Sequence, residues 1–150
     1  MADIGTFPTI RNVLESGENI LQYTAGAALK AGMVVAFHGT GVSRTVHPCV
    51  KGTTGMPVGV VIYDVSSGDE AAIAGPGCTA KVANFSDSVA IDAGDLLEPD
   101  DNAVGGTVHA LALLGALAML YSVGYAVDDI AASDTGFIMV QPQAVIDATS

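Results

Sequence analysis

Short apolar runs, separated by clusters of Gly, Ser and Asp, recur along the chain from residue 33 onward. The runs are rich in Val, Ile, Ala and aromatic residues, a length and composition typical of β-strands. We expect strands at residues 33–37, 59–63, 71–74, 80–83, 95–98, 123–127 and 136–140. The pattern therefore predicts a mainly β fold, a small barrel or sandwich.

Three segments depart from this rhythm. Residues 1–22 show mixed polarity without alternation, so we expect an extended N-terminal arm and a single β-rich domain over residues 23–150. Residues 39–55 contain turn residues throughout and predict a long loop. Residues 108–120 carry leucines at mixed helical spacing, which fits either one short helix or two β segments around Gly115.

Two sequence elements occur twice, in the same order. Residues 59–69 (GVVIYDVSSGD) match residues 124–134 (GYAVDDIAASD), and residues 29–35 (LKAGMVV) match residues 91–97 (IDAGDLL). Two copies are too few for a solenoid, which needs at least about three repeats. We therefore expect an internally duplicated β domain. Its related halves are expected at about residues 27–75 and 89–140.

Composition and charge restrict the classes of partner. The 150-residue chain is 50% apolar but only 14% charged, against roughly 25% charged in ordinary soluble domains, which favours burial of surface in an assembly. All five basic residues lie within residues 1–81, whereas residues 82–150 carry ten acidic residues and no basic one. Such a field disfavours nucleic-acid and membrane partners. It favours solubility in a crowded assembly, with a halophilic or calcium-rich habitat as the alternative.

Catalytic and cofactor motifs are not recognisable in the sequence, so we expect no enzyme activity, no catalytic residue and no cofactor. The sequence His47-Pro48-Cys49 offers two metal ligands, with His38 or Cys78 as a third. An ordinary loop is the better interpretation, and we expect no metal site. The two cysteines do not make a disulfide framework. They could form one bridge or stay reduced, and their pattern is closer to that of buried small apolar residues.

An acidic cluster at residues 92–102 offers oxygen ligands for calcium but lacks the spacing of an EF-hand loop. We favour turns in which Asp and Asn cap the backbone. The same interpretation applies to four aspartates in the repeated segments, where the turn itself recurs. These are Asp64, Asp69, Asp129 and Asp134.

The N-terminus lacks the basic and apolar regions of a secretory signal, which predicts synthesis in the cytoplasm. The longest apolar run, residues 110–121, is shorter than the roughly 20 residues that span a bilayer. We expect it to form core or interface.

The order of motifs resembles that of the capsid decoration proteins of tailed viruses. It runs from LKAGMVV (29–35) through PVGVV (57–61) and IDAGDLL (91–97) to SVGYAVDDIAASDTG (122–136), the most distinctive part. The resemblance covers roughly residues 23–142. It implies a β-tulip-like domain that forms a homotrimer on the capsid exterior of a virion and clamps neighbouring major capsid subunits.

We expect the capsid contact in the arm, because aromatic and Arg side chains are common interface anchors. The alternatives are packing on the protein's own barrel and disorder. The predicted capsid-binding residues are Phe7, Pro8, Ile10 and Arg11. The trimer contact is expected in the apolar segment, with an intramolecular core as the alternative. The predicted interface residues are Leu111, Leu114 and Leu117.

Other classes remain open. A tail or head-fibre module of a virion would share the β pattern and the acidic charge. A small-ligand or glycan-binding barrel is less favoured, because the chain has no Trp and only four Tyr for stacking. An enzyme is the least favoured class.

Overall fold

The computed structural model describes residues 7–37, 43–51, 54–84, 89–100, 105–112 and 118–147. These residues contain β-strands and no helix, so none of them forms a helix able to cross a membrane. The strands are β1 (Leu14–Ser16), β2 (Ile20–Ala25), β3 (Val34–Phe37), β4 (Thr45–Pro48), β5 (Pro57–Val61), β6 (Glu70–Ala74), β7 (Thr79–Asn84), β8 (Leu96–Pro99), β9 (Val108–Ala110), β10 (Ala118–Ala126) and β11 (Asp134–Asp147). The predicted mainly β fold is confirmed.

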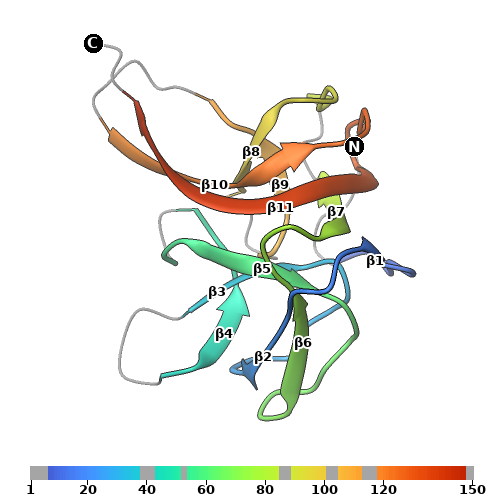
Figure 1. The fold of residues 1–150 in the computed structure, drawn as a ribbon, viewed down its shortest axis with the longest axis vertical. Helices are drawn as coiled ribbons and strands as arrows, with labels where there is room; N and C mark the ends of the chain where they lie inside the picture. The colour runs from blue at the N-terminus through green and yellow to red at the C-terminus, as the bar shows by residue number, and fades with distance from the viewer. Residues whose placement is uncertain are drawn as a thin grey trace.

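Strands β2 to β6, here called the first half, form a closed barrel in the order β2-β4-β3-β5-β6. All its pairings are antiparallel except β2 with β4. This half occupies the lower part of the molecule in Figure 1.

Strands β7 to β11, the second half, repeat every one of these pairings. β7 pairs with β9 in parallel and with β11 in antiparallel orientation, and β8 pairs with β9 and β10. The β7–β9 contact is a single residue pair, Asn84 with Val108, and it closes the cycle of pairings. Strand β1 is added at the edge of β7.

The strand registers of the two halves also coincide. Val35 lies opposite Gly59 in β3 and β5, and Leu97 lies opposite Gly124 in β8 and β10. The offset is 59 residues from β2 to β7, 62 from β3 and β4 to β8 and β9, and 65 from β5 and β6 to β10 and β11. The predicted internal duplication is therefore present, and each half begins one strand earlier than expected.

A capped turn recurs at the same place in each half. The Asp64 carboxylate accepts a hydrogen bond from the Ala31 N–H at 2.8 Å, and Asp129 accepts one from the Ala93 N–H at 2.8 Å. In each case the carboxylate accepts a hydrogen bond from a backbone N–H that has no partner in the sheet. Asp64 and Asp129 therefore cap the turn of a distant segment, 33 and 36 residues earlier in the chain, and not their own turn as expected.

A close backbone approach also recurs. At Gly59 an added Cβ would overlap the carbonyl oxygen of Ala74, and at Gly124 it would overlap that of Met139. A side chain at either position would push the two neighbouring strands apart. This explains why the repeated segment begins with Gly in both copies.

The described part of the predicted arm packs against the domain. Phe7, Ile10 and Val13 are buried in the core, and β1 pairs with β7. For residues 7–22 this corresponds to the alternative of packing on the protein's own barrel, with Ile10 lying against Gly32.

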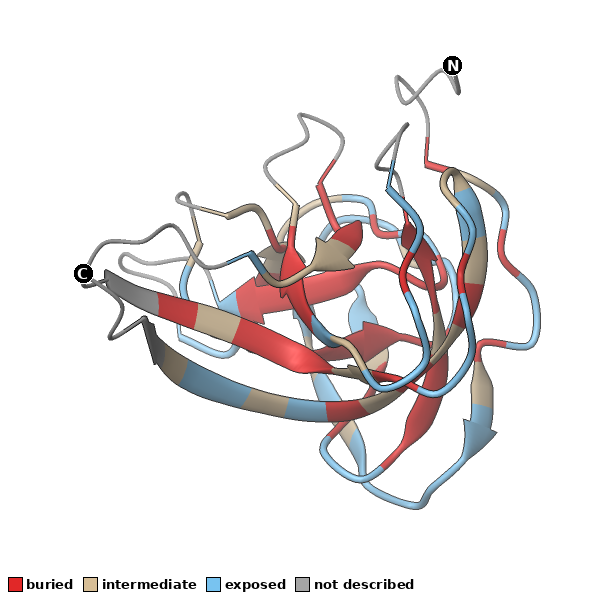
Figure 2. Ribbon diagram, turned by 90° about the horizontal axis from the view of Figure 1, so that it is seen from above, coloured by how far each residue is buried: buried red, intermediate tan, exposed pale blue. Residues whose placement is uncertain are grey.

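The predicted loop at residues 39–55 also needs correction, because it contains β4. The segment 108–120 contains β9 and the start of β10, as in the two-β alternative, while residues 113–117 lie outside the described part. Residues 118–122 of β10 pair with residues 143–147 of β11, beyond the stretches that pair with β7 and β8. This end of the strand pair is called the ribbon (Figure 1). Buried positions run through the strands of both halves as one continuous core (Figure 2).

Candidate functional site

The junction between the two halves is held by backbone contacts at Gly106. Its N–H donates to the Cys49 carbonyl at 3.0 Å, and its own carbonyl accepts from the Val34 N–H at 2.9 Å. A Cβ at Gly106 would lie 2.8 Å from Cγ of Met33. Glycine is needed here because the second half approaches the first at backbone distance, with φ of 80°.

Gly105 makes the neighbouring contact. A Cβ there would lie 2.8 Å from Cβ of Pro48 and 3.2 Å from Cγ2 of Val50. We call Gly105 and Gly106 the second corner, because they precede β9 in the second half. The surface of the first half that receives them is called the first seat. The first seat consists of Met33, Val34, Pro48 and Val50.

A cluster of four charged side chains lies beside this junction. The buried Glu98 of β8, whose side chain is 1% exposed, pairs with Lys51 at 2.5 Å and with Nε2 of His109 at 3.3 Å. Nδ1 of His109 lies 3.5 Å from Asp100, and the Ala112 N–H donates to Glu98 at 2.8 Å. Lys51 comes from the first half, so the ion pair joins the two halves.

The contacts of the cluster shift the pKa of its members. Burial alone would raise the pKa of Glu98, but hydrogen bonds from His109, Lys51 and the Ala112 N–H outweigh it and lower the pKa to about 2. Hydrogen bonds to Asp100 and Glu98, opposed by burial, raise the pKa of His109 to about 9. At neutral pH Glu98 is therefore ionised and His109 is protonated.

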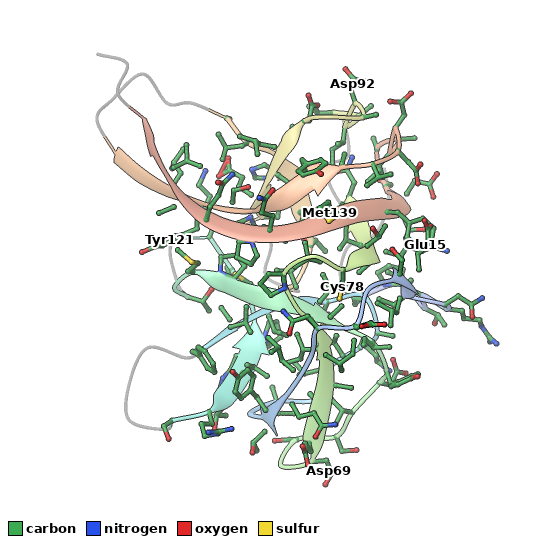
Figure 3. All side chains as sticks on the ribbon, in the orientation of Figure 1. Glu15, Asp69, Cys78, Asp92, Tyr121 and Met139 are labelled. Carbon is green, nitrogen blue, oxygen red and sulfur yellow. The ribbon has the colours of Figure 1, made fainter. Side chains whose placement is uncertain are left out.

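A cavity of about 350 Å³ opens next to the Lys51–Glu98 pair. Its walls include Cys49, Thr54 and Tyr121, so it lies between the first half and the ribbon (Figure 3). Burial raises the pKa of the Cys49 thiol to about 11, against a hydrogen bond from Thr54 that lowers it. The thiol is protonated at neutral pH and is a poor nucleophile.

Among the described residues, no group of three or more His, Cys, Asp or Glu side chains is arranged to hold a metal ion. His47 and Cys49 lie at β4 and just after it, and both cysteines are buried and free. His38 lies outside the described residues. In the acidic cluster, the Asp95 carboxylate accepts a hydrogen bond from the Asp92 N–H at 3.0 Å, as a turn requires.

The predicted capsid-binding residues separate into two groups. Phe7 and Ile10 are buried in this subunit, whereas Pro8 is partly exposed and Arg11 is exposed. Arg11 borders a groove of about 530 Å³, together with Tyr63, which is 70% exposed.

Of the predicted trimer residues, Leu111 is partly exposed just after β9. Leu114 and Leu117 lie outside the described residues. The use of these leucines in a subunit contact stays a prediction.

Sequence reasoning missed the charged cluster and the junction. One available signal was a third repeat, Thr45-Val46-His47 with Thr107-Val108-His109, at the same 62-residue offset as the strands around it. A second was the position of Glu98 inside an apolar strand. A buried carboxylate requires partners, and the lysine that pairs with Glu98 is Lys51 of the other half, not Lys81, which is nearer in the sequence.

No family model and no curated protein matches the chain. Among solved structures, the chain is similar to the N base of head fiber gp8.5 in bacteriophage phi29, with a TM-score of 0.56 and 19% sequence identity. The likeness covers 81% of this chain and 92% of that chain. The two chains share a fold.

Proposed function

We propose that this chain is a structural protein of a bacteriophage virion that binds the outer surface of the head. The observation that carries the proposal is the shared fold over 92% of a head-fibre base. The motif order of the sequence, which resembles that of capsid decoration proteins, supports the same class. In this proposal the chain is not an enzyme, and its partners are the major capsid protein and further copies of itself.

The finer proposal is that an oligomer bridges neighbouring major capsid subunits and stabilises the shell. Each contact can be modest, because simultaneous contacts raise the overall affinity. We place the capsid contact at Pro8 and Arg11, beside the groove that Tyr63 borders. Phe7 and Ile10 stabilise the segment from inside.

The second candidate is the base of a head fibre, which the fold of the phi29 protein favours. The two roles differ in how many copies a head carries. A decoration protein covers the lattice, whereas a fibre base occupies only the sites where fibres stand.

The proposal is tested by co-sedimentation of the purified protein with expanded, undecorated heads of its virus. We expect binding, and resistance of the heads to heat that rises with occupancy. The number of bound copies per head separates decoration from a fibre base. Failure to bind heads under any condition would contradict both roles.

Point variants locate the contact better than truncation, because removing residues 1–20 would also remove β1 and three core side chains. We expect Arg11→Ala to weaken head binding about tenfold, as for the loss of an interface anchor. Lys81→Ala, which removes the same charge elsewhere, is the matched control and is expected to bind normally.

A further inference from the structure

The duplication assigns each residue of the junction an equivalent in the other half. At the 62-residue offset, Ser43 and Arg44 take the place of Gly105 and Gly106 and form the first corner. The first seat likewise has an equivalent, the second seat. The second seat consists of Asp95, Leu96, Ala110 and Ala112.

Hydrogen bonds confirm that these positions correspond. Leu111 N–H donates to the Leu96 carbonyl at 2.8 Å, as Cys49 N–H donates to the Val34 carbonyl at 2.8 Å. Within one copy, the second corner is seated on the first seat. The first corner and the second seat are the two surfaces that this contact leaves unused.

Two positions of the unused surfaces are more exposed than their equivalents. In the first seat Met33 is 6% and Val34 0% exposed, whereas Leu96 of the second seat is 37% exposed. Beside the first corner, Phe37 is 41% exposed, whereas its equivalent Pro99 is buried. Each unused surface thus exposes one large apolar side chain where the equivalent side chain is covered.

The side chains have changed in size in a complementary way. In the intramolecular junction, Gly105 faces the larger Pro48 and Val50. In the unused pair the corner residue is the larger Ser43, and the seat residues are Ala110 and Ala112. A larger corner thus meets a smaller seat, which preserves the fit between them.

The charges are complementary at the next position. Gly106 faces Met33 in the junction, whereas the unused corner presents Arg44 and the unused seat presents Asp95. Among the ion pairs of the described residues within one copy, none joins Arg44 to Asp95. An intermolecular contact would supply the partner.

Arg44 is held in an unusual conformation. Its φ is 61°, in the left-handed region that its equivalent Gly106 adopts without a Cβ. Its guanidinium lies 5.7 Å from the ring centroid of Tyr23, which contacts Phe37 edge to face at 5.0 Å. A cation fixed on an aromatic pair at the protein surface is a preorganised anchor for an acidic partner.

The two unused surfaces lie at opposite ends of the molecule. The first corner borders the same hollow as Gly68 and Glu70, next to Asp69, and the second seat contains Asp95, which bonds to Asp92. Figure 3 shows Asp69 at the lower end and Asp92 at the upper end. We propose that the first corner of one copy docks on the second seat of the next, in a head-to-tail contact with Arg44 paired to Asp95.

Such a heterologous contact forms a ring if the rotation between copies closes. The contact forms between copies of this chain, so it can be measured with the purified protein alone and does not depend on a role in the virion. Loss of head binding and loss of self-association are therefore measured separately.

The experiment is a charge swap followed by sedimentation velocity over a range of protein concentrations. The wild type is expected to reach a defined multiple of 15.0 kDa. Arg44→Glu and Asp95→Arg should each weaken association by about tenfold or more, and R44E/D95R should restore most of it. Because each single variant keeps one surface intact, an equimolar mixture of the two should also associate.

Lys30→Glu is the matched control, since it makes the same charge change at an exposed position outside both surfaces. Circular dichroism and the unfolding midpoint verify that each variant is folded, and Leu96→Lys replaces Asp95→Arg if that variant is not. A wild type that stays monomeric at all concentrations would overturn the proposal. So would single variants that associate normally, or a double variant and a mixture without recovery.

Discussion

The strand pair β3–β4 in the first half places Ala36 opposite His47, whereas the equivalent pair β8–β9 in the second half places Glu98 opposite His109. The backbone frame is the same, but the first pair is mainly apolar and the second is ionic. The difference lies in what each pair meets. The second pair has Lys51 of the other half beside it, so its carboxylate is neutralised across the junction.

In both halves, glycine and aspartate at equivalent positions maintain the backbone. At the remaining positions, the side chain differs according to the residues that it contacts. Where the halves meet, the contact residues are glycine and apolar side chains, together with the Glu98–Lys51 ion pair. Surfaces that face outward carry charge and aromatic residues.

Removing Glu98 should have the largest effect. Glu98→Ala makes β8 resemble β3 but leaves Lys51 and His109 without their shared partner, so we expect a loss of about 3–5 kcal/mol in the free energy of unfolding. Urea denaturation measures it. E98A/K51M should recover part of the loss, since it removes the unpaired cation as well. A loss in E98A below about 1 kcal/mol would show that the cluster is not a stabilising element.

Adding a Cβ at the repeated glycine should have the next largest effect. Gly59→Ala and Gly124→Ala each force a backbone carbonyl away, and we expect a loss of about 2–3 kcal/mol in each half. Gly55→Ala, where the space is open, is the control and should change little. Gly124→Ala should cost the more of the two, because Gly124 also has a φ of 150°, which side-chain-bearing residues rarely adopt. A loss in only one half would mean that the two halves do not depend on the same strand approach.

The pH dependence of stability should come from the second half. The pKa of His109 is raised to about 9, so its contribution is complete below the unfolded value near 6.5 and is lost as pH rises through 9. We expect the free energy of unfolding to fall by about 2 kcal/mol between pH 7 and 9.5 through this group. The fall should be smaller in His109→Gln and unchanged in His47→Gln.

Two other groups change the stability outside the pH range in which His109 acts. The raised pKa of the Cys49 thiol lowers stability further between about pH 9 and 11, and this decline should persist in H109Q. The pKa of Glu98 is lowered to about 2, so its contribution is present above pH 4.5 and is lost as pH falls through 2. A wild type with flat stability from pH 7 to 9.5 would contradict the assignment of His109.

The capped turns should give the smallest effect, equal in both halves. Asp64→Ala and Asp129→Ala each remove one acceptor of a backbone N–H, and we expect a loss of about 1 kcal/mol for each. Asp64→Asn and Asp129→Asn keep an acceptor oxygen and should lose less. The two losses should add in the double variant, because the turns share no partner.

The sequence was sufficient for the strands with strong β-branched patterns and for the duplicated turns. It was insufficient for β4, whose four residues lie between segments rich in glycine and turn residues, so that the average over a longer window is dominated by the flanking segments. For Phe7 and Ile10 the sequence left packing on the protein's own barrel as an alternative to a capsid contact. Only the tertiary structure shows the space that these side chains fill.

The junction was hidden because its partners are far apart in the chain. Glu98 and Lys51 have no local sequence relation, and their pairing follows only from how the second half docks on the first. The repeated Thr-Val-His would have pointed to the corner, since identical residues at a constant offset mark equivalent positions.

The dependence of the first seat on the second corner has a consequence during synthesis. The ribosome has synthesised all strands of the first half once it adds Ala74. Gly106 is added 32 residues later. At roughly 5–20 residues per second, a ribosome needs about 2–6 s for this stretch. During that interval the nascent chain presents Met33 and Val34 uncovered, and a chaperone or the second corner of another copy can occupy the position that its own chain will later take.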